Sequence, residues 1–200
     1  MTDHFLLMNE QRRPWLDADS LKKKFLALSA ETHPDKIHTA TNAEKDAAAR
    51  RFAELNAAFN CLRETNSRLR HLIELETGRK AVDLQQMPND LADLFMEVGA
   101  LCRRVDSFLK EKAAVSSPLL LAQLFERSQS WVDQLQAMQR KINERHNALS
   151  ARLQSLDAQW MTSLGDRASL LPELEEIWRL MSFYGRWSNQ LQERVGQLAM

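Results

Sequence analysis

The side chains best suited to bind a metal or move a proton are the histidines and cysteines: His4, His33, His38, His71, His146, Cys61 and Cys102. No histidine stands at the spacing of a metal motif beside a thiol or carboxylate, and no glycine-rich loop is present to bind phosphate. His33, His38 and Asp35 have ligand chemistry, but polar side chains in an exposed loop usually contact only solvent. The cysteines lie in amphipathic stretches, as buried thiols of a reducing compartment do. We therefore expect no enzyme activity, metal or cofactor.

The composition excludes several classes of partner. The 200 residues are 44% hydrophobic and 27% charged, which suits one or two globular domains with a core. Basic and acidic residues number 27 each, so no net charge attracts nucleic acid or an anionic membrane. No segment approaches the length of a bilayer span, and residues 1–8 lack the basic start of a signal peptide. We expect a cytoplasmic protein that binds neither nucleic acid nor membrane.

Apolar residues recur at intervals of three and four rather than two, which predicts an all-α fold. Glycine and proline number only five each, so the helices should be long. Pro14, Pro34, Pro88 and Pro118 fall where the periodicity breaks, and Pro172 falls near the start of a new run. Because proline fits the first turn of a helix but not its interior, these positions indicate helix boundaries.

Three helices are expected in the first 80 residues. A short one covers residues 3–8, and a second is capped by Asp19 or Ser20 and ends near Thr32, before Pro34. The third begins at Asn42 and continues to a C-terminal cap at Gly78. The second and third should form an antiparallel hairpin.

The remaining chain predicts three more helices, the middle one about 45 residues long from Ser117 and Pro118 toward Gly165. Short loops at 113–118 and 165–169 favour an elongated three-helix bundle or antiparallel coiled coil. The predicted domains are residues 1–80, a linker at 81–89, and a C-terminal helical bundle at 90–200, to which the resemblance described below assigns client binding.

The most specific motif is His33-Pro34-Asp35, which lies in the loop of the predicted hairpin. Proline stops the helix and fixes φ, so His33 and Asp35 should stand on a stiff, exposed turn. A basic strip that could steer an acidic partner onto this turn is formed by Lys22, Lys23, Lys24 and Lys36.

Residues 3–76 resemble a J-domain, most closely that of the HscB-type co-chaperones of iron-sulfur cluster assembly. The resemblance rests on Asp3-His4-Phe5 with Leu7, Leu21 to Phe25, His33 to Lys36, and Phe52 to Phe59 with Leu62 and Arg68. It implies four helices and docking on a DnaK/HscA-type ATPase chaperone, in which the hydrolysis takes place. The chaperone-binding residues implied are His33, Pro34, Asp35, Lys22, Lys23, Lys24 and Lys36.

The second half resembles the same family more weakly, around Pro88 to Val105 and Trp178 to Val195. In that family the corresponding helices hold a cluster scaffold protein, which implies client contacts at Phe95, Met96 and Phe183. Arg103 and Arg104 stand where the family tends to have acids, so we expect them to border this patch with reversed charge. The metal-binding cysteines of some eukaryotic members are missing.

The resulting expectation is a co-chaperone that stimulates a DnaK/HscA-type ATPase and delivers a client, the iron-sulfur scaffold being the one the resemblance suggests. Two alternatives stay open: a J-domain protein with an unrelated client, and a structural coiled-coil protein with a degenerate J-domain. Nucleic-acid binding through Lys22 to Lys24 is disfavoured by the zero net charge.

Overall fold

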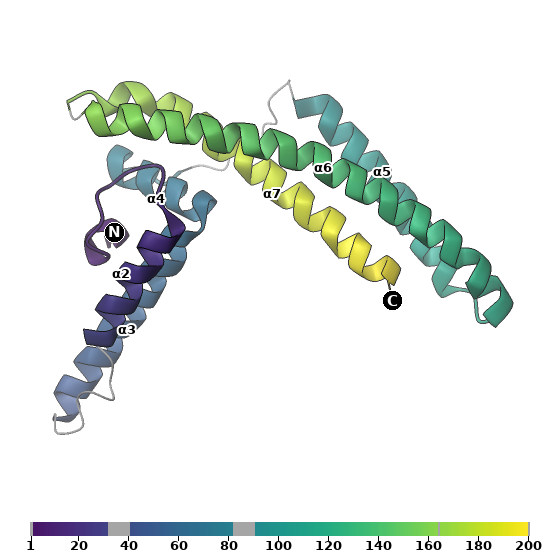
Figure 1. The fold of residues 1–200 in the computed structure, drawn as a ribbon, viewed down its shortest axis with the longest axis horizontal. Helices are drawn as coiled ribbons and strands as arrows, with labels where there is room; N and C mark the ends of the chain where they lie inside the picture. Colours follow the sequence, from purple (N-terminus) through teal and green to yellow (C-terminus); the bar gives the residue numbers. More distant parts are fainter. Residues whose placement is uncertain (1, 32–40, 82–90, 164, 200) are drawn as a thin grey trace. The chain divides into compact units, whose positions relative to one another are not determined.

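The computed structural model describes residues 2–31, 41–81, 91–163 and 165–199 (Figure 1). Within these ranges the chain forms helices and no strand, so the all-α prediction is confirmed. The elements in chain order are α1 (His4–Leu7), α2 (Ala18–Glu31), α3 (Asn42–Arg63), α4 (Thr65–Thr77), α5 (Ala92–Ala113), α6 (Pro118–Thr162), the 3-10 helix η3 (Arg167–Leu170) and α7 (Leu171–Ala199).

The helices group into two compact units. The N-terminal unit contains residues 1–82 together with 151–178, and the second unit contains 83–150 and 179–200. Residues 151–178 belong to the predicted C-terminal bundle by sequence, yet they pack with the first 82 residues. The reason is a set of buried contacts between the segment before α2 and the last turns of α6, which includes Arg13 with Asp157 and Arg12 with Trp160.

The hairpin of the N-terminal unit begins at caps that differ from the predicted ones. Asp17, not Asp19 or Ser20, caps α2, because its Oδ1 accepts the N–H of Ser20 at 2.8 Å. Thr41, not Asn42, caps α3 and forms a capping box with Glu44. A cap must lie outside the helix, so each true cap lies one or more residues earlier than the apolar pattern indicated.

The predicted third helix is two helices, broken at Glu64. Glu64 has an extended conformation, with φ −82° and ψ 114°, and α4 begins directly after it. The guanidinium of Arg68 stabilises the break, since its Nη1 donates to the carbonyl of Leu62 at 2.6 Å, near the end of α3. The predicted C-terminal cap at Gly78 is confirmed, with φ 66°.

The core of the N-terminal unit lies where α1, α2 and α4 pack against α3. Phe5, Leu21, Leu55 and Leu62 are buried there, as their helical spacing predicts. Phe25 of α2 stacks on Phe59 of α3, with ring centroids 4.3 Å apart. This stack and the buried Leu21 fix α2 against α3, and Figure 1 shows the two helices running side by side in opposite directions.

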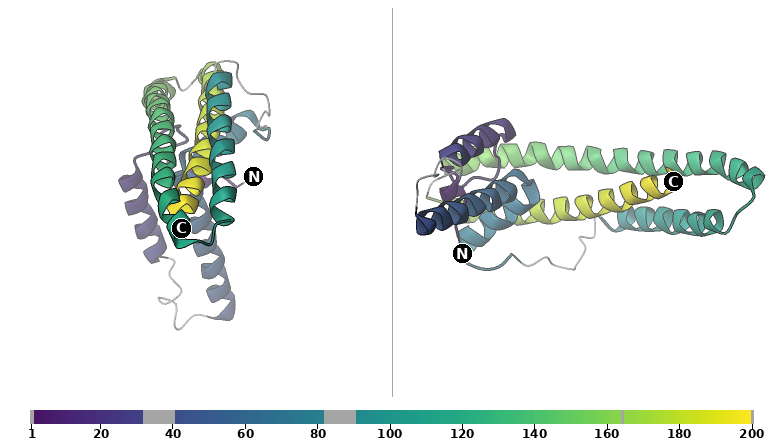
Figure 2. Two further views of the ribbon diagram at one scale, coloured as in Figure 1. Left: turned by 90° about the vertical axis from the view of Figure 1, so that its right-hand side faces the viewer. Right: turned by 90° about the horizontal axis from the view of Figure 1, so that it is seen from below.

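In the second unit α5 and the second half of α7 run alongside α6 (Figure 2). Buried side chains of α5 and α6 repeat at helical spacing, among them Leu94, Val98, Leu101, Val105, Leu135 and Ile142. A polar contact links each pair of these helices. Arg194 of α7 binds Asp106 of α5 at 2.8 Å, Lys141 of α6 binds Glu97 of α5 at 2.5 Å, and Gln139 of α6 donates to Ser188 of α7 at 2.7 Å. The three-helix arrangement therefore agrees with the fold predicted from the sequence.

The helix α6 covers 45 residues, as expected. Among the described residues no helix is both long enough and apolar enough to cross a bilayer.

Candidate functional site

The three lysines of α2 differ in their solvent exposure and in their contacts with the rest of the protein. Lys22 and Lys23 are exposed, whereas Lys24 is half-buried. The ammonium of Lys24 lies 2.8 Å from Oε1 of Glu10 and donates to the carbonyl of Asn9 at 3.2 Å. Lys22 and Lys23 are thus free to face a partner, while Lys24 also fastens α2 to the segment before it.

The tripeptide His33-Pro34-Asp35 and Lys36 lie outside the described residues. The bounds of the flanking helices still place this segment, because α2 ends at Glu31 and α3 begins at Asn42. The tripeptide therefore belongs to the connection between two antiparallel helices that are fixed to each other by the Phe25–Phe59 stack.

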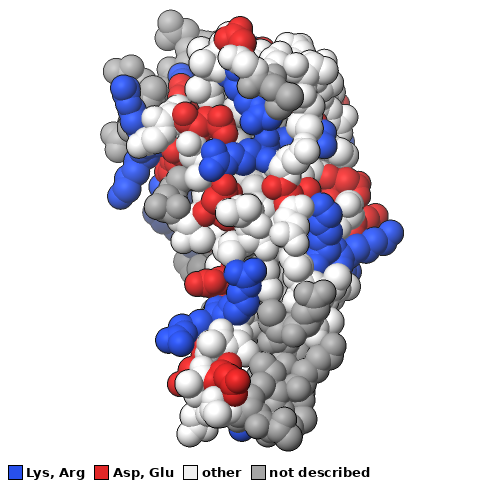
Figure 3. Space-filling model, turned by 90° about the vertical axis from the view of Figure 1, so that its left-hand side faces the viewer, with Lys and Arg blue, Asp and Glu red and all other residues white. Residues whose placement is uncertain are grey.

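The basic surface is local rather than extensive. On the face drawn in Figure 3, Lys and Arg side chains alternate with Asp and Glu side chains, and no single sign covers it. This pattern agrees with the zero net charge. Any electrostatic steering of a partner would then depend on a few exposed lysines such as Lys22 and Lys23.

A buried network missed by sequence reasoning anchors the segment before α2. The guanidinium of Arg13 binds both carboxylate oxygens of Asp157, with Nε 3.0 Å from Oδ1. The same Oδ1 accepts the backbone N–H of Trp15 at 3.0 Å, and the indole N–H of Trp160 donates to the carbonyl of Arg12 at 2.9 Å. The signal available in the sequence was an aspartate placed at helical spacing among Leu153, Leu156 and Trp160.

Arg68 is a second structural anchor close to the hairpin. It is 3% exposed, and it donates to the carbonyls of Pro14 at 2.9 Å and Leu62 at 2.6 Å and to the hydroxyl of Thr65 at 3.2 Å. Burial lowers the pKa of Arg68 to about 10. The arginine that carries part of the family resemblance therefore holds α3, α4 and residue 14 together and is unavailable to a partner.

Two of the three predicted client residues meet around one tryptophan. Phe95 of α5 is 44% exposed and lies 6.3 Å, centroid to centroid, from the indole of Trp187 on α7. The ring centroid of Phe183 lies 5.9 Å from that of the same indole. The guanidinium carbon of Arg186 lies 4.6 Å from the Phe183 ring centroid. Met96, the residue after Phe95, is 61% exposed. Phe95 and Met96 are therefore surface residues, while Phe183 is partly covered.

Of the two arginines expected to border this patch, the structure turns Arg104 toward α6. Its guanidinium lies 5.6 Å from the ring of Trp131 on α6, and it lines a groove between α5 and α6. The reason is helical geometry: nine residues at 100° each place Arg104 about 180° around α5 from Phe95. Arg103 is exposed and about 80° from Phe95, and Arg104, also exposed, is about 80° from Met96.

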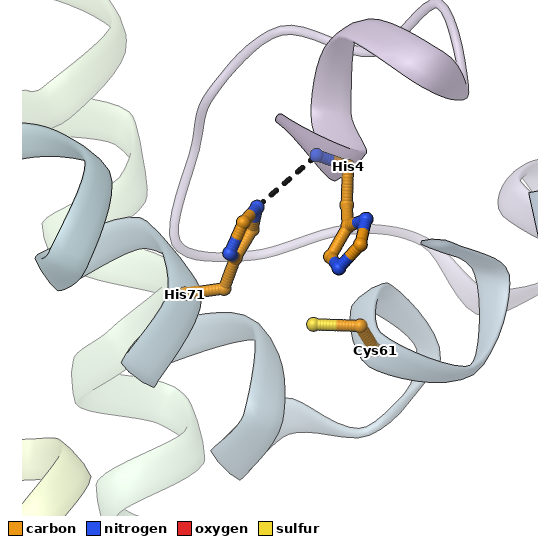
Figure 4. Close-up of side chains that lie close together, drawn as sticks. All are labelled: His4, Cys61 and His71. Carbon is orange, nitrogen blue, oxygen red and sulfur yellow. Dashed lines mark hydrogen bonds between the residues drawn. The ribbon is translucent and has the colours of Figure 1, made fainter. Parts of the chain in front are cut away.

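His4, Cys61 and His71 form a cluster that the spacing argument did not anticipate (Figure 4). They come from α1, α3 and α4, and one ligand atom of each lies within 4.8 Å of the other two. Nε2 of His71 accepts the backbone N–H of His4 at 3.1 Å. Separations of 57 and 10 residues in sequence match no metal motif, so only the fold brings the three together.

Known proteins are similar in sequence to part of the chain. No family model matches the chain. A curated HscB co-chaperone homologue of Bordetella petrii is 36% identical over 91 residues, which are 46% of this chain and 51% of that protein. A homologue of Acinetobacter baumannii is 38% identical over 74 residues, 37% of this chain and 40% of that protein. The matches thus span about half the length of these curated relatives, or less.

Two solved structures show the same fold over nearly the whole chain. Chaperone HscB from Vibrio cholerae aligns with a TM-score of 0.57 and 21% identity, covering 98% of this chain and 99% of that one. Human HscB aligns with a TM-score of 0.56 and 17% identity, covering 96% and 82%. The chain is therefore similar in sequence to HscB co-chaperones and has their fold.

Proposed function

We propose that this chain is a J-domain co-chaperone that docks on a DnaK/HscA-type chaperone, stimulates its ATPase and delivers a client held on its C-terminal helices. The observation that carries the proposal is the 36% identity to an HscB co-chaperone homologue, combined with the HscB fold over nearly the whole chain. Hydrolysis then takes place in the partner, and the chain contributes binding energy and position.

The chaperone-binding face consists of Lys22, Lys23 and the tripeptide His33-Pro34-Asp35. Its support comes from the rigidity of the hairpin, since α2 and α3 are fixed by the Phe25–Phe59 stack and by Leu21. The connection that carries the tripeptide therefore starts and ends on two helices that are fixed to each other. Lys22 and Lys23 are exposed and suit an acidic surface on the chaperone. Lys24 assists chiefly by holding α2 through Glu10.

The client-binding face consists of Phe95, Met96 and Phe183 around Trp187. Exposed aromatic and methionine side chains on a rigid helix pair are the residue types that dominate binding energy in protein interfaces. Trp187 is buried and contacts both phenylalanines, so it holds them in place. We assign the iron-sulfur cluster scaffold as the client, because the relatives that support the co-chaperone function are HscB proteins.

The co-chaperone activity is tested with purified components. The ATPase rate of a DnaK/HscA-type chaperone is measured with increasing amounts of the full chain. A saturable rise in rate is expected. A rate that does not change over the whole titration would exclude the co-chaperone function and leave a structural helical protein.

The client is tested separately by calorimetric titration of a cluster scaffold protein. The wild type should bind, and the double variant Phe95→Ala, Met96→Ala should bind at least about tenfold more weakly, because both side chains are exposed and contribute to contact rather than to folding. Phe125→Ala is the control, since Phe125 is another exposed phenylalanine, on α6. No binding by the wild type, together with intact ATPase stimulation, would show that the client is an unrelated protein.

A further inference from the structure

The cluster of His4, Cys61 and His71 has a chemistry that neither proposed binding face uses. We infer that these three side chains form a binding site for a single Zn²⁺ ion, or another thiolate-binding transition metal ion, in the N-terminal unit. The site joins three elements, because His4 belongs to α1, Cys61 to α3 and His71 to α4. Such an ion would stabilise the packing of α1 on the α3–α4 pair.

The donor set determines the kind of metal. Two imidazoles and one thiolate are typical ligands of Zn²⁺ and of other soft or borderline ions, whereas Mg²⁺ and Ca²⁺ require mainly oxygen ligands. The nearby carboxylate of Glu74 already accepts from Arg70 Nε at 3.2 Å and from the N–H of Ala81 at 3.2 Å. These two bonds occupy its Oε1 atom, and the ligand atoms that lie within 4.8 Å of one another are those of His4, Cys61 and His71, which are therefore the proposed ligands.

The distances permit coordination after a small rotation of side chains. In a tetrahedral zinc site, bond lengths of about 2.0–2.3 Å place the ligand atoms roughly 3.3–3.8 Å apart. The three atoms here lie within 4.8 Å of one another, and the two imidazole centroids are 4.4 Å apart. Figure 4 shows the Cys61 thiol and both rings directed toward a common space. The approach needed is about 1 Å, which rotations about the side-chain bonds provide.

An unsatisfied buried atom gives the independent support. Nδ1 of His4 is buried, and among the described residues no group donates to it or accepts from it. Buried polar atoms are nearly always paired, so such an atom indicates an absent partner. The thiol of Cys61 makes only a weak contact, 3.7 Å to the carbonyl of Ser67. The His4 ring and the Cys61 thiol therefore have no strong side-chain hydrogen bond to lose when a metal ion binds.

Room for a fourth ligand is present. A cavity of about 420 Å³ is lined by the three residues and by Thr2, Ser67, Arg70 and Glu74. Water can therefore complete the coordination, as in zinc sites with three protein ligands. Coordination at Nε2 of His71 would replace its hydrogen bond from the N–H of His4. That amide lies in the first turn of α1, where water can accept its hydrogen bond.

The test uses the full chain, freed of metal with a chelator and titrated with Co²⁺ as a spectroscopic probe. We expect one equivalent to bind with a thiolate-to-cobalt charge-transfer band and the intense visible bands of a tetrahedral site, and Zn²⁺ to displace it. The amide resonance of His4 should shift in the same titration. Absence of the charge-transfer band in the wild type would overturn the inference.

Matched variants separate this site from other ligands. Cys61→Ser should lose the charge-transfer band and bind Co²⁺ at least about 100-fold more weakly, since losing even an outer-shell partner costs 10–100-fold. Cys102→Ser, which removes the buried thiol of the second unit, should behave as the wild type. Zn²⁺ should raise the melting temperature of the wild type and of Cys102→Ser but not of Cys61→Ser. A band that persists in Cys61→Ser or disappears in Cys102→Ser would contradict the assignment.

Discussion

Arg13 and Asp157, which are 144 residues apart in the sequence, form a bidentate ion pair that joins the segment before α2 to the end of α6. Asp157 is 4% exposed, and it also accepts the backbone N–H of Trp15. A carboxylate this buried is stabilised only while its charge is matched and its oxygens are hydrogen-bonded. The pair therefore explains why residues 151–178 pack with the first 82.

Replacing Asp157 by alanine should lower the free energy of unfolding of the N-terminal unit by about 3–5 kcal/mol, because Arg13 and the amide of Trp15 lose their acceptor. Asp157→Asn should cost less, since an amide oxygen can still accept from Trp15. Chemical denaturation monitored by circular dichroism measures both. Asp133→Ala, an exposed change on the same helix, is the control, and an equal loss in that variant would refute the explanation.

Arg68 should not be replaceable by lysine. Its guanidinium makes three hydrogen bonds in different directions, to Pro14, Leu62 and Thr65, which one ammonium group cannot reproduce. Leaving buried carbonyls without donors costs about 1–3 kcal/mol, so Arg68→Lys should lower the melting temperature clearly. Arg70 is exposed and lies two residues further along α4, so Arg70→Lys should change the free energy of unfolding by less than about 1 kcal/mol. Equal melting temperatures for the two variants would disprove this role.

The start of α3 should depend on pH. The N–H of Thr41, and then its hydroxyl, lower the pKa of Glu44 by donating to its carboxylate. A carboxyl with a lowered pKa stabilises the fold above its unfolded pKa, and this contribution is lost as the pH falls through the lower, folded value. Hydrogen exchange of the first-turn amides of α3 should therefore accelerate as the pH falls below about 4.5, relative to intrinsic rates. Glu44→Gln should remove that extra acceleration, whereas Glu54→Gln should retain it.

Reversing the charge of Lys22 and Lys23 should slow association with the chaperone. Both side chains are exposed, so the double variant Lys22→Glu, Lys23→Glu changes steering without changing the core. The effect should be largest at low ionic strength and should shrink at 0.1 M salt, where the screening length is about 10 Å. Stopped-flow association measures it, with Lys110→Glu on α5 as the control. An association rate insensitive to both the double change and salt would place the docking face elsewhere.

Helix periodicity and proline positions were enough to predict the all-α fold and the long α6, because these features depend on neighbouring residues. The break at Glu64 was not predictable in this way, since it is stabilised by Arg68, whose partners come from three segments. The Arg13–Asp157 pair and the His4, Cys61 and His71 cluster also depend on contacts distant in sequence. The contact of Arg104 with Trp131 of α6 is likewise a relation between two helices that spacing along α5 alone does not reveal.

The central claim is that the turn between α2 and α3 drives hydrolysis in a DnaK/HscA-type chaperone. Single-turnover ATP hydrolysis by that chaperone tests it most directly, with the wild type, His33→Gln and His38→Gln compared at equal concentration and equal circular dichroism spectra. We expect acceleration by the wild type and by His38→Gln, and none by His33→Gln. Full acceleration by His33→Gln would contradict the proposed mechanism.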